Sequence, residues 1–490
     1  MSPKTIGSLS RLAILSFTIA ALAAVGCGTG SLMSGGSQSA GPTGSSFVVG
    51  TDQPLASVVS YVASISVTAT PVGDTPGGSS DVTLVTSQNV DFARYNGLQT
   101  LLDENTVTAQ SYGTITISLT GGTIGYLSVP TPPATGAPTI ATMAATYASG
   151  SNPVQITLTN PFVVPTTGAP AGLRVDFDLA DSIGVDMNGN ITGTVTPTFH
   201  VKPVRNSDSS AHIDELIGGV TQTPQSATPD NFGITGPHGQ QFTVVTSSTT
   251  EWDGTDSLST LNTNSVVAVA GQLDVATQTI DADEVAVLTD SNFVATGLAT
   301  YVTPSTGQAT GLDFYVRKVL PSALTDVPLG GIAQVNITGN ENYSVFWMHN
   351  KFSQMLFNAS ALSPGQEIAV GGTDTEATPS SGSAITVDRI HLQNWGYNGT
   401  VVANSQNQGQ GSFTMTITGF AGVVVPTNVT VIAGSACDFR YGFGAFSDLS
   451  NGASVRVVGV LLKNSTNGNL VLVARHIDGW NFTDFSTFAF

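Results

Sequence analysis

The sequence contains only two cysteines, Cys27 and Cys437, among its 490 residues. Two cysteines cannot build the disulfide framework of a small secreted scaffold. Cys437 lies in the strand-like run from Val429 to Phe439, without a nearby histidine that could activate its thiol. We therefore expect Cys437 to be a small buried side chain, which leaves Cys27 as the cysteine with a chemical role.

Positively charged residues are also scarce. The chain has 14 Lys and Arg against 33 Asp and Glu, which gives a formal net charge of −19. Beyond the N-terminal segment, the densest basic element is the isolated pair Arg317-Lys318. A surface that follows nucleic-acid phosphates needs clustered cations, so nucleic acid is not an expected partner.

Several catalytic motifs are missing. The sequence has no Gly-x-Ser-x-Gly, no His-Glu-x-x-His and no Walker-type Gly-Lys-Ser/Thr. His200, His391 and His476 lie in strand-like runs, each without a second histidine at metal-ligand spacing. We expect packed or half-exposed imidazoles, no catalytic residue and no cofactor. A triad assembled from distant segments stays open at this point.

The chain is instead rich in Thr, Ser, Gly, Asn and Val, while charged residues make up 10% of it. This composition is typical of β structure rather than of disorder or of helices. A length of 490 residues favours three or four domains. We therefore expect an all-β chain with several separate cores.

The segment 1–27 has the layout of an export signal. Lys4 and Arg11 give it a positive start, and the apolar run Leu12–Val25 is shorter than the roughly 20 residues that span a bilayer. The run ends in Ala24-Val25-Gly26-Cys27, which resembles the bacterial lipobox. This resemblance implies that the Cys27 thiol receives a lipid before cleavage on its N-terminal side. The alternative is an ordinary secretory signal that contains a cysteine by chance.

Residues 28–46 are mostly Gly and Ser and are predicted to be a flexible tether. The residue after the lipid site is Gly28 rather than Asp, which in lipoproteins of bacteria with two membranes implies sorting to the outer membrane. We therefore expect an extracytoplasmic protein that a lipid anchors to the outer membrane or cell surface.

Residues 47–205 are predicted to form a β-sandwich. Apolar and polar residues alternate at 60–70 and 114–120, as on half-buried strands. Between them, Leu98, Leu101 and Leu102 would share one face of a short helical turn.

This region resembles a family of uncharacterised domains found in envelope lipoproteins. The similar segments are Val90-Asp91-Phe92, Val107–Tyr112, Val175–Leu179, and Pro197 with Val201. The resemblance implies a sandwich of prealbumin-like type and no assigned chemistry.

Asp176 and Asp178 flank Phe177 within one of these segments. On a strand, both carboxylates would face one side while Phe177 faces the core. The pair is a candidate metal site. The alternative is that the carboxylates are hydrogen-bonded to turns or exposed to solvent.

A motif with equal internal spacing, Leu-x-x-Asn/Gly-x-x-Val/Ile-x-Val-x-Gly, occurs three times in the C-terminal half. Its copies are Leu261–Gly271, Leu362–Gly372 and Leu449–Gly459, and a weaker strand-like motif follows each copy. A turn that leads into a buried strand, a glycine that permits a bulge and a closing strand suit a small barrel.

The copies resemble a second uncharacterised family of short β modules, which look like five-stranded OB-type barrels. We expect three modules, at 217–290, 293–393 and 395–490, the last with an aromatic tail. OB-type barrels bind oligonucleotides or sugars through one face, and the lack of a basic groove disfavours oligonucleotides.

Trp347, Trp395 and Trp480 stand in aromatic clusters and are the candidate ligand-binding residues, because flat rings stack on sugars. The alternative is that these rings fill cores.

These features favour a non-catalytic, lipid-anchored envelope protein whose modules act as an extracytoplasmic binding or spacer array. Its expected partners are the membrane, through the lipid, and a glycan or another envelope protein. A carbohydrate-binding surface protein is the alternative. A metal-assisted hydrolase that uses Asp176 and Asp178 is a third hypothesis.

Replacing Cys27 with Ala tests the anchor. Because the Cys27 thiol is the expected site of lipid attachment, radioactive fatty acid should label the wild-type protein and not Cys27→Ala. The matched control Cys437→Ala should keep the label. Unchanged labelling of the Cys27 variant would show that the anchor does not exist.

Overall fold

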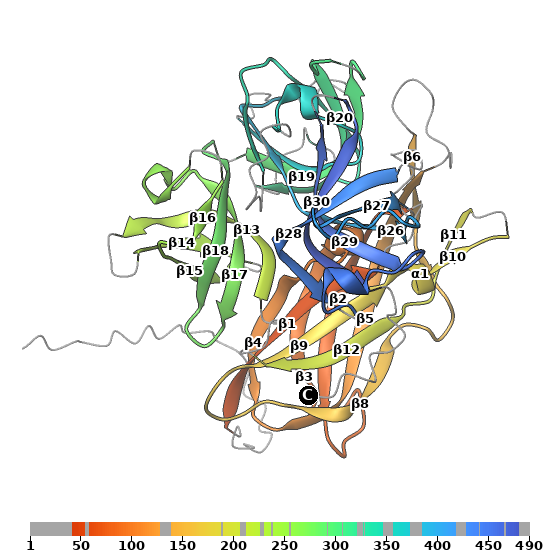
Figure 1. Ribbon diagram of the computed structural model, residues 1–490. Coiled ribbons are helices and arrows are strands. Elements are labelled where there is room, and N and C mark those ends of the chain that lie inside the picture. The colour runs from red at the N-terminus through yellow and green to blue at the C-terminus, as the bar shows by residue number, and fades with distance from the viewer. Residues whose placement is uncertain are drawn as a thin grey trace, which may run out of the picture. The chain divides into compact units, whose positions relative to one another are not determined.

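The computed structural model of the chain is almost entirely β, which confirms the predicted class (Figure 1). It describes residues 42–53, 58–127, 139–187, 190–205, 212–225, 230–236, 239–253, 256–291, 293–305, 307–320, 327, 329–345, 356–372, 385–417, 428–440, 442–464 and 467–479. The predicted export signal 1–27 lies outside these ranges. No helix within them has the length and apolar character needed to cross a membrane.

The N-terminal part of the chain, which we call the sandwich, contains two main sheets and a small third one. Its elements are β1 (Thr43–Gln53), β2 (Val58–Pro71), β3 (Val82–Asp91), η1 (Phe92–Tyr95), β4 (Thr100–Thr108), β5 (Ser111–Leu127), β6 (Ile140–Ala144), β7 (Thr146–Tyr147), β8 (Val154–Val163), β9 (Ala171–Asp178), α1 (Leu179–Ser182), β10 (Ile183–Val185), β11 (Ile191–Val195) and β12 (Phe199–Arg205). The main sheets have the orders β12-β9-β1-β4 and β3-β2-β5-β6, with β8 also paired to β5, and the small sheet is β10-β11-β7.

The two main sheets share one apolar core. The alternation predicted for 60–70 is confirmed, because Tyr61, Ile65 and the other odd-numbered residues from 61 to 69 on β2 are buried. The ring of Tyr61 stacks on Phe92 and on Phe177 of β9, with centroids 5.8 and 5.4 Å away. Apolar side chains on one face of each sheet therefore hold the two layers together.

Two local predictions for this region are wrong. The expected helical turn at Leu98–Leu102 is instead an irregular Leu98-Gln99 pair followed by the start of β4 at Thr100, where Leu101 pairs with Val49 of β1. Leu101 and Leu102 point to opposite faces, into different apolar clusters, so pairing with β1 outweighs the local helical spacing. The expected tether also ends early, because β1 begins at Thr43.

The C-terminal half contains three further sheets, which we call the first, second and third modules. The first has β13 (His212–Gln225), β14 (Asp230–Thr235), β15 (Gln241–Thr246), β16 (Glu251–Trp252), η4 (Leu258–Thr260), β17 (Val266–Asp274) and β18 (Thr279–Thr289). The second has β19 (Phe293–Thr303), β20 (Gly311–Leu320), β21 (Ile332–Asn336), β22 (Asn342–Val345), η5 (Ala359–Ala361), β23 (Glu367–Gly372), β24 (Ile385–Thr386) and β25 (Arg389–Leu392). The third has β26 (Trp395–Val401), β27 (Ser412–Ile417), β28 (Asn428–Arg440), η6 (Phe446–Asp448), β29 (Ser454–Lys463) and β30 (Leu470–Gly479).

The three modules repeat one strand order. The third is a closed barrel in the order β26-β27-β28-β30-β29. The first follows the same path, β13-β14-β15-β18-β17, which the parallel pairing of β15 with β18 closes. In the second, β24 pairs with β21 and β25 pairs with β23. These two consecutive short strands together take the place that the fifth strand has in the other modules.

The repeated motif has the structure that its residue types suggest. In each copy a short 3-10 helix, η4, η5 or η6, ends directly before the leucine, and the apolar residues then enter a buried strand. In the first and third copies a shift of strand register falls beside the motif glycine, Gly271 or Gly459. A side chain there would collide with the carbonyl of Asp281 or Val473, so the bulge needs glycine.

A second repeated glycine lies on the first strand of each module and was not anticipated. Gly218 of β13, Gly297 of β19 and Gly399 of β26 each approach a backbone carbonyl of the next strand closely. The strands can therefore bend tightly enough to close the small sheets only where a side chain is missing.

Gly218 and its neighbour Gly219 form a matched pair for testing this constraint. A Cβ on Gly218 would meet the Thr235 carbonyl oxygen, whereas a Cβ on Gly219 meets nothing. We expect Gly218→Ala to destabilise the fold by about 1–3 kcal/mol, as overpacking does, and Gly219→Ala to change it by less than about 0.5 kcal/mol. Thermal melts compare the two, and equal midpoints would contradict the close approach.

Candidate functional site

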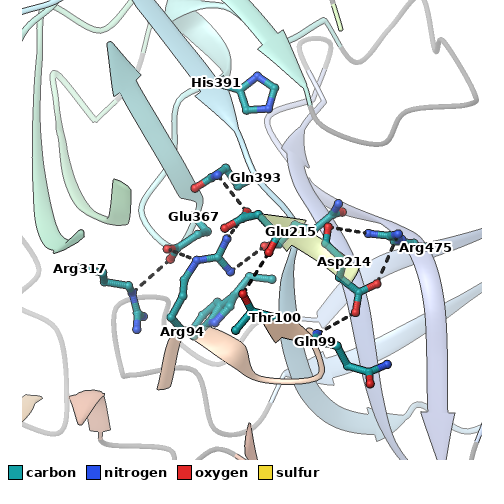
Figure 2. Close-up of polar contacts among 12 residues, drawn as sticks. Arg94, Gln99, Thr100, Asp214, Glu215, Arg317, Glu367, His391, Gln393 and Arg475 are labelled. Atoms are coloured by element: carbon teal, nitrogen blue, oxygen red, sulfur yellow. Dashed lines mark hydrogen bonds and ion pairs between the residues drawn. The ribbon is translucent and has the colours of Figure 1, made fainter. Parts of the chain in front are cut away.

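The most concentrated chemistry in the described chain is a buried group of charged residues that we call the ionic junction (Figure 2). The junction takes residues from the sandwich and from all three modules. Its members are Asp91, Arg94, Asp214, Glu215, Arg317, Glu367 and Arg475.

Arg94 contacts the first module, the second module and the residue directly before the third from one guanidinium group. It lies in η1 of the sandwich and is 4% exposed. It donates to Glu215 Oε2 of the first module at 2.6 Å and lies 3.2 Å from Glu367 Oε1 of the second. It also donates to the carbonyl of Asn394, just before the third module, at 3.3 Å. Burial lowers the pKa of Arg94, but Glu215 and Glu367 raise it further, so Arg94 stays charged.

Arg317 continues the junction within the second module. Its guanidinium lies 3.4 Å from Glu367 Oε2 and donates to Asp91 Oδ2 of the sandwich at 3.4 Å. It also lies over the ring of Trp395, 5.3 Å from the ring centroid. Glu367 is therefore bracketed by two arginines, and the Trp395 ring covers one of them.

A second branch of the junction ties the first module to the third and to the sandwich. Asp214 Oδ2 accepts from the backbone N–H of Gln99 at 2.8 Å, and Asp214 Oδ1 lies 3.3 Å from the Arg475 guanidinium. Burial opposes ionisation of Asp214, but Arg475 and His212 outweigh it and hold its pKa at about 2. The Asp214 carboxylate is thus ionised at neutral pH.

The turn that carries Arg94 fits between its partners because two glycines leave room. Asn96 donates to the carbonyl of Gly396 at 2.7 Å, and a Cβ on Gly396 would collide with the Asn96 carbonyl. Gly97 has a φ of 73° and lies against Val458 and Arg456 of the third module. A side chain at Gly97 would be strained and would also push the module away.

The sequence carried a signal for this junction that composition alone did not reveal. The structure describes the burial of seven arginines, and six of them are buried: Arg94, Arg174, Arg317, Arg389, Arg456 and Arg475. In a chain with so few cations, single arginines set in apolar strands indicate buried ion pairs rather than a solvated surface. Their partners lie up to hundreds of residues away in the chain, so the sequence does not predict which carboxylate pairs with which arginine.

Ser344, His391 and Asp253 come together in space in the order of a catalytic triad. Ser344 Oγ lies 2.6 Å from His391 Nδ1, and His391 Nε2 lies 3.5 Å from Asp253 Oδ2. Burial, with Arg389, lowers the pKa of His391 to about 3. Burial and Glu284 raise the pKa of Asp253 well above its usual value. A general base needs a pKa near the working pH, so an imidazole with a pKa as low as that of His391 is poorly suited to this role.

Asp176 and Asp178 lie on one face of β9, and Phe177 points into the core, as predicted. Both carboxylates are buried. Asp178 Oδ1 accepts from the backbone N–H of Asp181 at 2.9 Å and caps α1, while Asp176 faces Arg174 and Arg456. Within the described ranges, no three His, Cys, Asp or Glu side chains are grouped so that they could hold a metal ion.

The other predicted site residues have different environments. Trp395 is 4% exposed and donates from Nε1 to the carbonyl of Ala93 at 3.2 Å, so its ring is a buried part of the junction and offers no face to a sugar. Trp347, Trp480 and Cys27 lie outside the described residues. Cys437 is half-buried, and burial raises its pKa to about 12, which leaves an unreactive thiol.

Comparison with known proteins identifies one family. Residues 46–194 match the model of a family described as Domain of unknown function (DUF4382). The expected similarity of the sandwich to an uncharacterised domain is therefore confirmed. The match includes Asp91 and Arg94 but none of the three modules. No curated protein matches the chain, and no solved structure does.

Removing the Arg94 guanidinium should weaken the whole assembly. Arg94→Met leaves Glu215 and Glu367 buried without their shared cation, and breaking a buried pair in this way costs about 3–5 kcal/mol. We expect a clearly lower midpoint in thermal unfolding. Lys463→Met removes one cation at the end of β29 and should shift stability by less than about 1 kcal/mol. A loss no larger than that of the control would contradict the role of the junction.

Proposed function

We propose that this chain is a non-catalytic envelope protein, in which an uncharacterised N-terminal domain and three β modules form one extracytoplasmic binding or spacer unit. The observation that carries the proposal is the ionic junction. Its charged groups bind one another across the boundaries between units, so their chemistry is used to hold the units together rather than offered to a substrate.

Apolar contacts across the same boundaries support this role. Phe47 and Val49 of β1 belong to the same apolar cluster as the core of the first module. Val460 and Leu462 of β29 belong to that of the second module. A spacer can hold a partner at a fixed distance only if its units do not rotate freely against one another. The shared apolar clusters and the buried ion pairs restrict that rotation.

The strand path common to the three modules favours the OB-type reading of the repeat. It is a five-stranded ring in which the third strand pairs in parallel with the fifth. OB-type barrels bind ligands through one face, so we propose that a glycan or another envelope protein is the partner, with no role for nucleic acid. The burial of Trp395 removes the one described tryptophan offered for sugar stacking.

The location rests on the N-terminal sequence. The apolar run before Cys27 and the lipobox-like residues support lipid attachment at that thiol, and the Gly/Ser-rich segment that follows supports a tether. We propose that the lipid anchors the protein outside the cytoplasm, at the outer membrane or cell surface.

Assays of the purified full-length protein against glycan, ester and peptide substrates test the non-catalytic role. We expect no hydrolysis above the level of buffer, with or without added divalent metal. Ser344→Ala and Asp176→Asn are the variants to compare, because they remove the triad-like hydroxyl and the candidate metal carboxylate. A turnover that either substitution abolishes would overturn the proposal.

A further inference from the structure

His212 lies where the first module meets the third. It is the first residue of β13, and its side chain is 19% exposed. Its Nε2 atom lies 2.9 Å from Nη2 of Arg475, on β30 of the third module. Its Nδ1 atom lies 3.5 Å from Oδ2 of Asp283, on β18 of its own module. The imidazole ring therefore connects a carboxylate to a guanidinium group, an arrangement that we call the His212 bridge.

The contact with Arg475 fixes the protonation of the ring. A guanidinium group has five N–H donors and no acceptor, so Arg475 donates and Nε2 of His212 accepts. A ring nitrogen accepts a hydrogen bond only when it carries no hydrogen of its own. The ring is therefore neutral, and its one N–H is at Nδ1, on the side of Asp283.

Arg475 has a second partner at the same place. Its Nη2 atom also lies 3.3 Å from Oδ1 of Asp214, and its Nη1 atom donates to the Asp214 carbonyl at 3.4 Å. Figure 2 shows Arg475 and Asp214 facing each other. Losing the bond to His212 would therefore weaken the contact between β13 and β30 without abolishing it.

The surroundings of the ring act on its charge in both directions. Burial has the largest effect and opposes a positive charge, the nearby arginines add to it, and the nearby carboxylates favour a positive charge. β17, which pairs with β13, places the uncharged Gln272 opposite His212. The charged and titratable groups on the strands around the ring are Asp214 of β13, Asp283 of β18, Arg440 of β28, and Arg475 and His476 of β30.

We propose that the His212 bridge makes the contact between the first and third modules sensitive to acid. A proton on Nε2 removes the acceptor of the Arg475 hydrogen bond and places two cations side by side, so the contact between β13 and β30 loosens. The bridge itself does not depend on the location proposed above. Its use does, because a protein outside the cytoplasm is exposed to the pH of its surroundings.

The direction of the pH dependence follows from the pKa of His212. That pKa is lowered in the folded protein, so the contribution to stability is complete above the unfolded value of 6.5 and is lost as pH falls through the folded value. His391 and His476 act in the same direction, because burial lowers their pKa values to about 3 and about 4. His200 acts in the opposite direction, because its contact with Asp178 raises its pKa. A variant of His212 is needed to separate its effect from the others.

Nuclear magnetic resonance of the six histidine rings in the full-length protein tests the protonation of the bridge. His212→Gln identifies the signals of this ring by their loss. At pH 7 we expect Nδ1 to carry a hydrogen and Nε2 to carry none, and the ring should become charged only below pH 6.5. A ring that is charged at pH 7, or that carries its hydrogen on Nε2, would overturn the proposal.

Asp283→Asn gives an independent identification of the same ring. The Asp283 side chain is 57% exposed, so the substitution should leave the fold intact. Because this carboxylate favours the charged form of His212, its removal should shift the titration of that ring to lower pH. A variant in which every histidine titrates as in the wild type would contradict the bridge.

Thermal unfolding of the full-length protein at pH 7 and at pH 5 measures the consequence for stability. Glutamine keeps a side-chain oxygen that can accept from Arg475 but takes up no proton, so the midpoint of His212→Gln should fall less than that of the wild type. His200→Gln is the matched control, and its midpoint should fall at least as much as that of the wild type. Equal falls in the wild type and His212→Gln would show that the bridge does not carry the acid sensitivity.

Hydrogen exchange locates the loosening. After correction for the intrinsic pH dependence of exchange, β30 should lose more protection between pH 7 and pH 5 in the wild type than in His212→Gln. β21 of the second module should respond equally in both proteins. No difference at β30, or an equal difference at β21, would show that the proton does not act on the contact between the first and third modules.

Discussion

A buried guanidinium is stable only where hydrogen-bond acceptors and opposite charge surround it. Arg94 has them on the first module, on the second module and on the carbonyl of Asn394, directly before the third. Glu215, Glu367 and the Asn394 carbonyl belong to segments that begin more than a hundred residues after η1. No one of these segments supplies all the acceptors of Arg94, and without Arg94 the buried Glu215 and Glu367 would each lose a cation. The charges therefore specify which surfaces of the sandwich and the modules meet, while the apolar clusters around them supply most of the stabilisation.

The modules could not make this arrangement without small residues at fixed places. Glycines on the first and fourth strands of a module allow backbones to approach closely enough for a sheet of five short strands to close. Gly97 and Gly396 allow an equally close approach between the sandwich and the third module. Closure leaves few free strand edges, which protects the modules against pairing edge to edge with other chains.

Burial decides the chemistry of the remaining polar residues. Burial lowers the pKa of His391 to about 3 and raises that of Asp253, so the imidazole in this triad-like group is uncharged at neutral pH. In the ionic junction, Arg475 and His212 hold the pKa of Asp214 at about 2, whereas burial raises the pKa of Glu367 although Arg317 and Arg94 lie beside it. The pKa of a buried carboxyl group therefore depends on the balance between its burial and the cations around it.

The sequence by itself determined the β class, the alternation on β2, the threefold repeat and the bulge-forming glycines, because these depend on the period of side chains along a strand and on the one residue without a Cβ. It also placed Asp176 and Asp178 together on one face of β9 and Phe177 on the other. It misread Leu98–Leu102, where pairing with β1 outweighs local spacing. It left Trp395 open between a sugar-stacking ring and a ring that fills a core, and the structure buries that ring against Arg317. Only the tertiary structure decided these points and the partners of each arginine, because contacts between residues 94, 215 and 367 follow from how folded units meet and leave no periodic trace in the chain.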